Sequence, residues 1–195
     1  MRYKGLRIGF GITGSFCTLE AVFKQIEGLL AEGAEIIPIV TQEVATIDTR
    51  YGAAALWLSR LEELTGHTVL KDIVGVEPLG PNKLIDVVVI APCTGNTLAK
   101  LANGITDNPV LMAAKAHLRN GGPVVIAIST NDGLGLNARN LGTLLNTKNV
   151  YFVPFGQDNP AGKPNSLVAK MDMVGPTIAE ALKGRQLQPV LVTYN

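Results

Sequence analysis

The sequence predicts an α/β protein with a doubly wound, Rossmann-like or flavodoxin-like fold of three layers around a parallel sheet. Apolar runs rich in Val and Ile recur along the chain, and each is followed by a small or glycine-rich turn and then by helical periodicity. The runs are continuous and do not alternate with polar residues, as expected for strands that are covered on both faces. Strict alternation of strand and helix implies right-handed crossovers and therefore a parallel sheet.

The expected elements cover most of the chain. Strands are expected at 6–11, 34–40, 86–91, 123–128 and 150–155. Helices are expected near 17–31, 50–65, 95–103, 108–119, 136–146 and 166–183. Two segments rich in proline and glycine, 74–83 and 155–166, are expected to be loops. Long ordered loops in a compact α/β domain are more often functional than decorative.

Length and composition favour one domain over residues 1–195. Hydrophobic residues make up 47% of the chain and charged residues 17%, so part of the apolar surface is expected to be buried between subunits. The net charge of +1 gives no basic field for a phosphate backbone, and nucleic acid is not an expected partner. No stretch approaches the roughly 20 apolar residues of a membrane span, which predicts a cytoplasmic protein.

The two cysteines suggest neither a disulfide nor a metal site. Cys17 and Cys93 lie in two different apolar elements, far apart in the sequence. No metal-ligand spacing is present around them, so we expect reduced thiols and no bound metal.

The first expected strand ends in a glycine- and hydroxyl-rich turn, Gly9-Phe10-Gly11-Ile12-Thr13-Gly14-Ser15. Glycines let the backbone approach an anion closely, and hydroxyls and the first amides of a helix can donate to a phosphate. The glycine spacing fits neither the dinucleotide fingerprint nor a Walker loop, which favours a mononucleotide. The alternative is that the glycines only form a strand-to-helix turn.

Two further strand ends are expected beside the same crevice. Thr41 follows the second strand and could donate to the same ligand or cap a helix. The segment Ala-Pro-Cys-Thr-Gly-Asn-Thr at 91–97 follows the most apolar strand and would place amides and the Asn96 side chain against a planar ring. Alternatively, Thr94 or Asn96 caps the helix that begins there.

Taken together, these motifs resemble the FMN-binding flavoprotein family that contains the FMN-dependent cysteine decarboxylases. The resemblance is carried by 11–15, Thr41, 91–97 and 101–109. It covers essentially the whole chain, and 128–137, 155–160 and 163–166 resemble one subgroup of that family most sharply. The cofactor that it implies is FMN. The cofactor-binding residues that it implies are Gly11, Thr13, Gly14 and Ser15 for the phosphate, Pro92, Thr94, Gly95, Asn96 and Thr97 for the flavin ring, and Thr41.

The chain departs from the decarboxylases at their two substrate-handling motifs. Residues 73–80, where the resemblance places the catalytic histidine, contain none. His67 lies in an expected helix-ending turn and His117 inside an expected helix, so no catalytic residue is assigned. Residues 129–131, Ser-Thr-Asn, replace the substrate-recognition motif, which favours a different substrate.

The resemblance implies a small, planar, doubly anionic substrate, namely a dihydropyridine dicarboxylate. Carboxylates require amides, hydroxyls and a cation at short range, because charge-assisted hydrogen bonds offset the cost of desolvation. The substrate-binding residues predicted in this way are Asn131, Asn137, Arg139, Lys163, Asn165 and Ser166.

The implied activity is oxidation of this substrate to pyridine-2,6-dicarboxylate during spore formation, in the mother-cell cytoplasm. FMN would accept hydride, NADP is the candidate terminal oxidant, and a different partner chain, the A subunit of the same enzyme, is implied together with a trimer-based homo-oligomer. Two alternatives stay open at this point. One is a flavin-dependent decarboxylase of a cysteine conjugate, and the other is a noncatalytic nucleotide-binding protein that supports a partner dehydrogenase.

Overall fold

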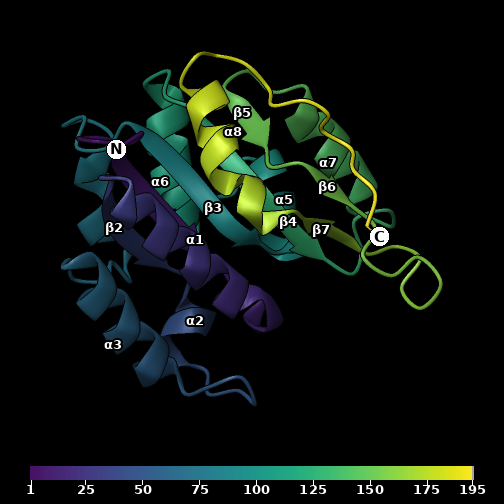
Figure 1. Cartoon of the computed structure of the whole chain (residues 1–195), viewed down its shortest axis with the longest axis horizontal. Helices are drawn as coiled ribbons and strands as arrows, with labels where there is room; N and C mark the ends of the chain where they lie inside the picture. The colour runs from purple at the N-terminus through teal and green to yellow at the C-terminus, as the bar shows by residue number, and fades with distance from the viewer. Residues whose placement is uncertain (195) are drawn as a thin grey trace.

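A mixed seven-stranded sheet with helices on both faces forms the centre of the molecule (Figure 1). This computed structural model describes residues 1–194. The strand order is β2-β1-β3-β4-β7-β6, and β5 pairs with β4. The predicted Rossmann-like or flavodoxin-like α/β architecture is confirmed.

Five strands form the parallel part of the sheet. They are β1 (Arg7–Ile12), β2 (Glu35–Val40), β3 (Val87–Cys93), β4 (Val124–Thr130) and β5 (Val150–Phe152). Every residue of β3 is buried, as the continuous apolar run predicted for a central strand. All five strands lie within one to three residues of their expected positions.

The sheet is not wholly parallel, which corrects the prediction. Two short strands, β6 (Phe155–Gly156) and β7 (Leu167–Ala169), run antiparallel to their neighbours. Because β5 pairs only with the first half of β4, the edge of β4 at Ser129 and Thr130 is free to pair with β7. The helix expected at 166–183 therefore begins later, and the loop expected at 155–166 begins with a strand.

The helices cover both faces of the sheet. Their bounds are α1 (Leu19–Ala31), α2 (Gln42–Thr46), α3 (Ala54–Thr65), α4 (Ile73–Val76), α5 (Gly95–Ala102), α6 (Pro109–Arg119), α7 (Ala138–Leu145) and α8 (Val174–Ala181). Three-residue 3-10 turns lie at Phe16–Thr18, Glu77–Leu79 and Met171–Met173. In Figure 1, α1 and α8 lie in front of the sheet and α5 and α6 behind it. Helix α3 packs beside α1, with the rings of Phe23 and Trp57 5.5 Å apart. The loop expected at 74–83 is partly helical, because the Asp72 carboxylate caps α4 by accepting from the Gly75 N–H.

The strand order places a crevice between β1 and β3. From β1 the sheet continues to β2 on one side and to β3 on the other, so the order reverses between β1 and β3. In open α/β sheets, ligands bind outside the carboxyl ends of the strands at such a switch point. Thr13, Thr41 and Thr94 each follow directly after one of these three strands. Among the described helices, none combines the length and the hydropathy of a membrane span.

His117, near the end of α6, packs at the amino ends of the strands, away from the crevice. Its side chain is buried, and its Nε2 lies 3.3 Å from the carbonyl oxygen of Asp86. The ring fills the space that a side chain at Gly122 would occupy. Burial lowers the pKa of His117 below its ordinary value, because the charged form would be poorly solvated.

We expect His117 to make stability fall as the solution becomes acidic. A histidine whose pKa is lower in the folded state does not change the free energy of unfolding at pH values above its unfolded pKa of about 6.5. As pH falls below that value, the free energy of unfolding decreases progressively, because the unfolded chain binds the proton more readily. Thermal unfolding of the wild type should therefore depend more steeply on pH between about 7.5 and about 5.5 than that of His117→Gln. Parallel curves for the two proteins would contradict this role.

Candidate functional site

A cavity of about 220 Å³ lies at the carboxyl ends of β1, β2 and β3. We call it the Thr41 cavity. Its lining residues are Thr13, Gly14, Phe16, Thr41, Glu43, Ile47, Thr94, Asn96, Thr97 and Asn108. Six of them, Thr13, Gly14, Thr41, Thr94, Asn96 and Thr97, are predicted cofactor residues. The structure thus brings three separate sequence motifs together around one cavity.

The hydroxyl of Thr41 is buried without a partner among the described residues. Thr41 is only 2% exposed, and its Oγ1 makes no hydrogen bond. It occupies the N-cap position of α2, but its side chain does not cap the helix. The capping alternative is therefore not realised. An unsatisfied buried hydroxyl costs about 1–3 kcal/mol, and a ligand that accepts from it would remove this cost.

The hydroxyl of Thr13 joins the two sides of the crevice. It donates to the carbonyl of Pro92 at 2.7 Å and accepts from the N–H of Thr94 at 3.0 Å. Thr13 is buried, so these bonds are shielded from water. The turn after β1 and the turn after β3 are held together by this one side chain.

Two glycines of the first turn differ in their surroundings. A Cβ at Gly11 would lie 2.8 Å from Val110 Cγ1 and 3.3 Å from the carbonyl oxygen of Val89, so Gly11 allows α6 to pack against β1. A Cβ at Gly14 would meet nothing closer than 3.5 Å. Gly14 lines the cavity, whereas Gly11 lies inside the strand and does not line it.

At the start of α5, Thr94 is the N-cap residue, and the side chain of Asn96 does not cap the helix. The Thr94 hydroxyl accepts from the N–H of Thr97 at 3.3 Å and donates to the Thr97 hydroxyl at 3.1 Å. Asn96 is exposed, and its side chain makes no hydrogen bond within the described residues. The predicted alternative that Asn96 caps the helix is not realised.

A second cavity of about 290 Å³ adjoins the first. We call it the Ser166 cavity. Its lining residues are Gly14, Ser15, Cys17, Thr18, Thr94, Gly95, Ser129, Thr130, Asn131, Asp158, Lys163, Ser166 and Val168. Gly14 and Thr94 line both cavities and form the wall between them. Of the predicted substrate residues, Asn131, Lys163 and Ser166 lie here.

The two loops with the predicted substrate residues come together. The N–H of Leu134 donates to the carbonyl of Asn165 at 3.0 Å, which ties the 131–137 loop to the 157–166 loop. A Cβ at Gly95 would lie 2.6 Å from Thr130 Oγ1 and 2.7 Å from Asn137 Nδ2. Gly95 therefore lets the start of α5 pack closely against the same region.

Other predicted residues lie outside both cavities. Asn137 holds its own loop, because it donates to Asp132 at 3.3 Å and accepts from Asn140 at 3.0 Å. Arg139 is exposed on α7, and Asn165 contributes its carbonyl to the loop contact. Pro92 is buried, and its carbonyl is bonded to Thr13. Ligand roles for these residues and for Gly11 stay predictions.

Neither histidine lies at the carboxyl ends of the strands, where the two cavities are. His67 Nε2 is 3.2 Å from Glu35, the first residue of β2, and therefore lies at the amino ends of the strands. His117 contacts Asp86, which directly precedes β3 and is 2.8 Å from Arg7 at the start of β1. An imidazole base from this chain is therefore absent from both cavities.

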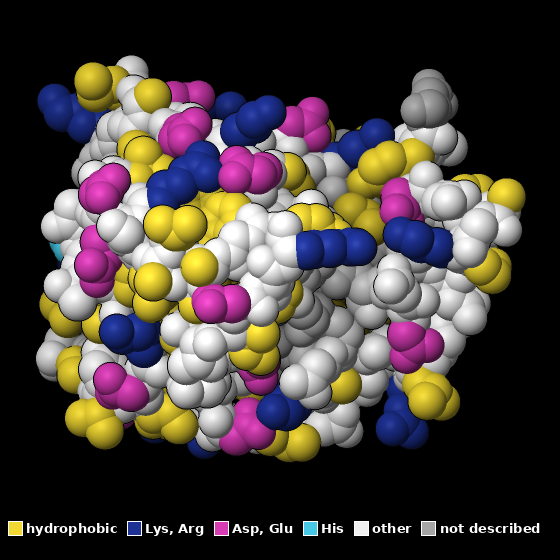
Figure 2. Space-filling model, turned by 90° about the horizontal axis from the view of Figure 1, so that it is seen from below, with side chains coloured by type: hydrophobic (Ala, Val, Ile, Leu, Met, Phe, Trp, Pro, Cys, Tyr) yellow, Lys and Arg dark blue, Asp and Glu magenta, His cyan; other side chains and the backbone are white. Residues whose placement is uncertain are grey.

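The face that carries the strand ends shows no single field of charge. Figure 2 views the side of the molecule that lies lowest in Figure 1, toward which β3 and β4 run. The surface is hollowed near its middle, and charged side chains of both signs are scattered across it (Figure 2). Among residues 1–194, no group of acidic, histidine or cysteine side chains could hold a metal ion.

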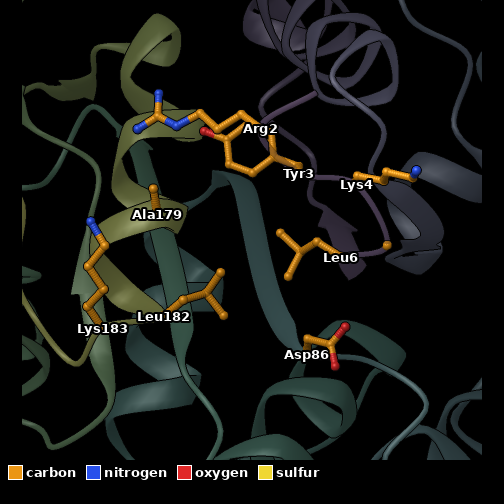
Figure 3. Close-up of a pocket in the computed structure, with 9 residues that line it drawn as sticks. Arg2, Tyr3, Lys4, Leu6, Asp86, Ala179, Leu182 and Lys183 are labelled. Atoms are coloured by element: carbon orange, nitrogen blue, oxygen red, sulfur yellow. The ribbon is translucent and has the colours of Figure 1, made fainter.

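A larger cavity, of about 570 Å³, lies at the opposite edge of the sheet (Figure 3). It is lined by residues 2–6, Asp86, Ala179, Leu182 and Lys183. Two of its charged groups have partners within the chain, because Asp86 pairs with Arg7 and Lys183 pairs with Glu180 at 2.9 Å. It contains none of the predicted site residues and lies at the amino ends of β1 and β3, away from the switch point.

Several residues that line the two cavities are not among the binding residues that the sequence predicts. They are Phe16, Glu43, Ile47 and Asn108 in the Thr41 cavity, and Cys17, Thr18, Ser129, Thr130, Asp158 and Val168 in the Ser166 cavity. Half of them, Phe16, Cys17, Thr18, Glu43 and Asp158, follow a strand end by two to six residues, and Ser129 and Thr130 are the last two residues of β4. The position of the strand ends was the signal that could have found them.

Comparison with known proteins identifies the family. The chain matches the model of the Flavoprotein family over residues 1–175. The chain therefore belongs to the Flavoprotein family, as its motifs predicted. It is 59% identical over 189 residues to the dipicolinate synthase B subunit of Bacillus subtilis (strain 168), and the match covers 97% of this chain and 94% of that protein.

Solved structures agree with this assignment. The dipicolinate synthase B subunit from Bacillus halodurans matches with a TM-score of 0.91 and 51% identity, over 99% of both chains. The FMN-dependent cysteine decarboxylase SpaF matches with a TM-score of 0.66 and 23% identity, over 93% of this chain and 97% of that one. The SpaF match shows the fold alone. The subgroup that the sequence resembles is thus that of the dipicolinate synthase B subunits.

We expect alanine substitutions at Gly11 and Gly14 to affect different properties, stability at Gly11 and FMN binding at Gly14. Gly11→Ala should destabilise the protein by about 1–3 kcal/mol, because the new methyl overpacks β1 against Val110. Gly14→Ala should change stability by less than about 0.5 kcal/mol, because its methyl meets only ordinary contacts, and it should weaken FMN binding by crowding the ligand. Denaturant unfolding and FMN titration of both variants test this. Unchanged FMN affinity in Gly14→Ala would count against a ligand at this turn.

Substitutions of Thr94 and Asn96 should likewise affect different properties. Thr94→Ala should cost about 0.5–2 kcal/mol of stability, because α5 loses its N-cap. Asn96→Ala should leave stability nearly unchanged and weaken FMN binding by about 1 kcal/mol, as one hydrogen bond is lost. If Asn96→Ala lowers the melting temperature and keeps full FMN affinity, its predicted contact with the flavin is wrong.

Proposed function

We propose that this protein is an FMN-dependent flavoprotein that converts dihydrodipicolinate to dipicolinate as one of the two kinds of subunit of dipicolinate synthase. Its similarity to dipicolinate synthase B subunits over nearly the full length supports this activity. We further propose that residues 1–195 act as a single flavoprotein-like domain, in the mother-cell cytoplasm of a spore-forming bacterium. The observation that carries the cofactor assignment is the unpartnered Thr41 hydroxyl at the switch point of the sheet.

The residues of the Thr41 cavity fit the phosphate end of FMN. Gly14 leaves its backbone open to close approach, and Thr41 offers a hydroxyl donor. The N–H of Asn96 and that of Gly95, which lines the neighbouring Ser166 cavity, lie in the first turn of α5, where no intrahelical acceptor exists for them. These neutral donors suit an anion at a helix N-terminus.

The size of the cavity supports a homo-oligomer. At about 220 Å³ it is smaller than typical cofactor sites of roughly 300–1,000 Å³, so the flavin ring would extend beyond it. Leu136, on the loop beside the Ser166 cavity, is 85% exposed and would be buried by a neighbouring copy of the chain. We propose a trimer-based assembly of this chain, acting with the dipicolinate synthase A subunit as partner.

The proposed reaction removes two hydrogens from the ring. One leaves as hydride and one as a proton, and the product is an aromatic pyridine. FMN, when bound, supplies the hydride acceptor, and NADP is the proposed terminal oxidant. The residues of this chain have mainly to position the substrate and to exclude competing reactions.

The decarboxylase alternative has less support. It requires a catalytic histidine near the flavin, and both histidines of this chain lie at the opposite edge of the sheet. The fold match to SpaF carries no substrate, because its identity is only 23%.

We expect Thr41→Val to weaken FMN binding by about 2 kcal/mol, because a hydrogen bond to a charged phosphate is lost. The stability of the FMN-free protein should stay unchanged or rise, since an unsatisfied buried hydroxyl is removed. Thr46→Val is the matched control, because Thr46 is exposed on the same helix and its hydroxyl bonds to the Gln42 carbonyl at 2.8 Å. Equal FMN affinity in all three proteins would contradict the assignment.

The activity is tested with the purified protein and FMN. We expect a bound-flavin absorption band that bleaches when dihydrodipicolinate is added without oxygen, with formation of dipicolinate. Adding the A subunit and NADP should restore the band and give turnover. If the protein binds FMN but no bleaching occurs even with the A subunit present, the noncatalytic alternative is correct and the proposed function is wrong.

A further inference from the structure

The Ser166 cavity is placed to hold a second ligand against the first. It shares the lining residues Gly14 and Thr94 with the Thr41 cavity, so ligands in the two cavities would be neighbours. Its polar lining differs in kind, because it gathers serine hydroxyls and a lysine. Its volume of about 290 Å³ suits a small ring better than a nucleotide.

The hydroxyl of Ser166 has no partner among the described residues. Ser166 is 1% exposed, and its Oγ makes no hydrogen bond. Its backbone N–H donates to the carbonyl of Lys163 at 3.0 Å, and the next residue, Leu167, pairs with Thr130 in the sheet. The residue is therefore held by the sheet, and its free donor is a cost that a bound acceptor would remove.

A hydrogen-bonded pair of serines lies in the same cavity. Ser15 Oγ and Ser129 Oγ are 2.8 Å apart, which joins the turn after β1 to the end of β4. In such a pair one hydroxyl donates, and the accepting hydroxyl keeps its own hydrogen for another partner. When Ser15 donates to Ser129, the hydrogen of Ser129 is free, and together with Ser166 the cavity then offers two free O–H donors, one for each oxygen of a carboxylate. Ser15 Oγ also lies 3.9 Å from Cys17 Sγ.

The charges of the cavity come from one loop. Lys163 and Asp158 both line it, and the loop is braced by bonds from the Gln157 amide to the Pro164 carbonyl at 2.8 Å and from the Lys163 N–H to the Asn159 carbonyl at 2.7 Å. Lys163 attracts an anion and Asp158 repels one. Substitutions of the two should therefore change anion affinity in opposite directions.

We propose that the Ser166 cavity is a carboxylate subsite, in which Ser166 and the Ser15–Ser129 pair donate hydrogen bonds to one carboxylate of a small pyridine or dihydropyridine dicarboxylate. Lys163 balances its charge, and the ring lies toward the wall formed by Gly14 and Thr94. This inference rests on the proposed function for the identity of the ligand. It assigns Ser15 to the substrate, although the sequence predicted a role at the FMN phosphate.

Calorimetric titration of pyridine-2,6-dicarboxylate into the FMN-loaded protein tests the subsite. Ser166→Ala should bind it about tenfold more weakly, the effect of one charge-assisted hydrogen bond. Lys163→Gln should bind more weakly and with less dependence on salt, whereas Asp158→Asn should bind more tightly. Ser59→Ala is the matched control, since Ser59 is exposed on α3 and bonds to Glu63 at 3.0 Å.

The outcomes separate this inference from the proposed function. Equal affinities in the wild type and Ser166→Ala, or loss of FMN from Ser166→Ala, would overturn the subsite. A lower melting temperature in Ser166→Ala would reveal a partner within the chain and would also overturn it. The titration is repeated without FMN. If FMN does not bind but Ser166-dependent dicarboxylate binding persists, the proposed function fails and the subsite stands.

Discussion

The site depends on the hydrogen bonds that Thr13 makes across the switch point of the sheet. Strands β1 and β3 are neighbours along their length, but their chains leave in different directions at the carboxyl ends. The Thr13 hydroxyl bridges this divergence by bonding to Pro92 and Thr94. The same contact fixes Gly14 on one side and the start of α5 on the other, and these form the wall shared by both cavities.

The hydroxyls around the crevice fall into two groups with different energetics. Those of Thr13 and Thr94 are satisfied within the chain and contribute to its stability. Those of Thr41 and Ser166 are buried and unsatisfied, so the folded chain bears a cost at each. One such hydroxyl lies in each cavity. This distribution is what a site built for two polar ligands would show, because each ligand would remove one of the costs.

The sequence predicted the strand ends well, because a continuous apolar run marks a doubly covered strand and parallel strands bring their carboxyl ends to one edge. Thr13, Thr41 and Asn96 could be placed together on that basis. It could not predict β7, because Leu167–Ala169 is a short apolar run whose pairing with β4 depends on how far β5 extends. For the same reason Ser129 was not recognised as a partner of Ser15, 114 residues away. Residue type alone also does not reveal that the amide of Asn137, a predicted substrate residue, is bonded to Asp132 and Asn140.

The position of the histidines bears on the kind of chemistry this edge of the sheet can support. With both imidazoles at the opposite edge, the titratable groups that line the cavities are Glu43 in one and Cys17, Asp158 and Lys163 in the other. Asp158 is exposed, so a proton passed to it can be exchanged with water. An oxidation that yields an aromatic ring needs only one such acceptor beside a well-placed hydride acceptor, since aromaticity supplies much of the driving force. The arrangement therefore suits a reaction in which positioning of the substrate does most of the work.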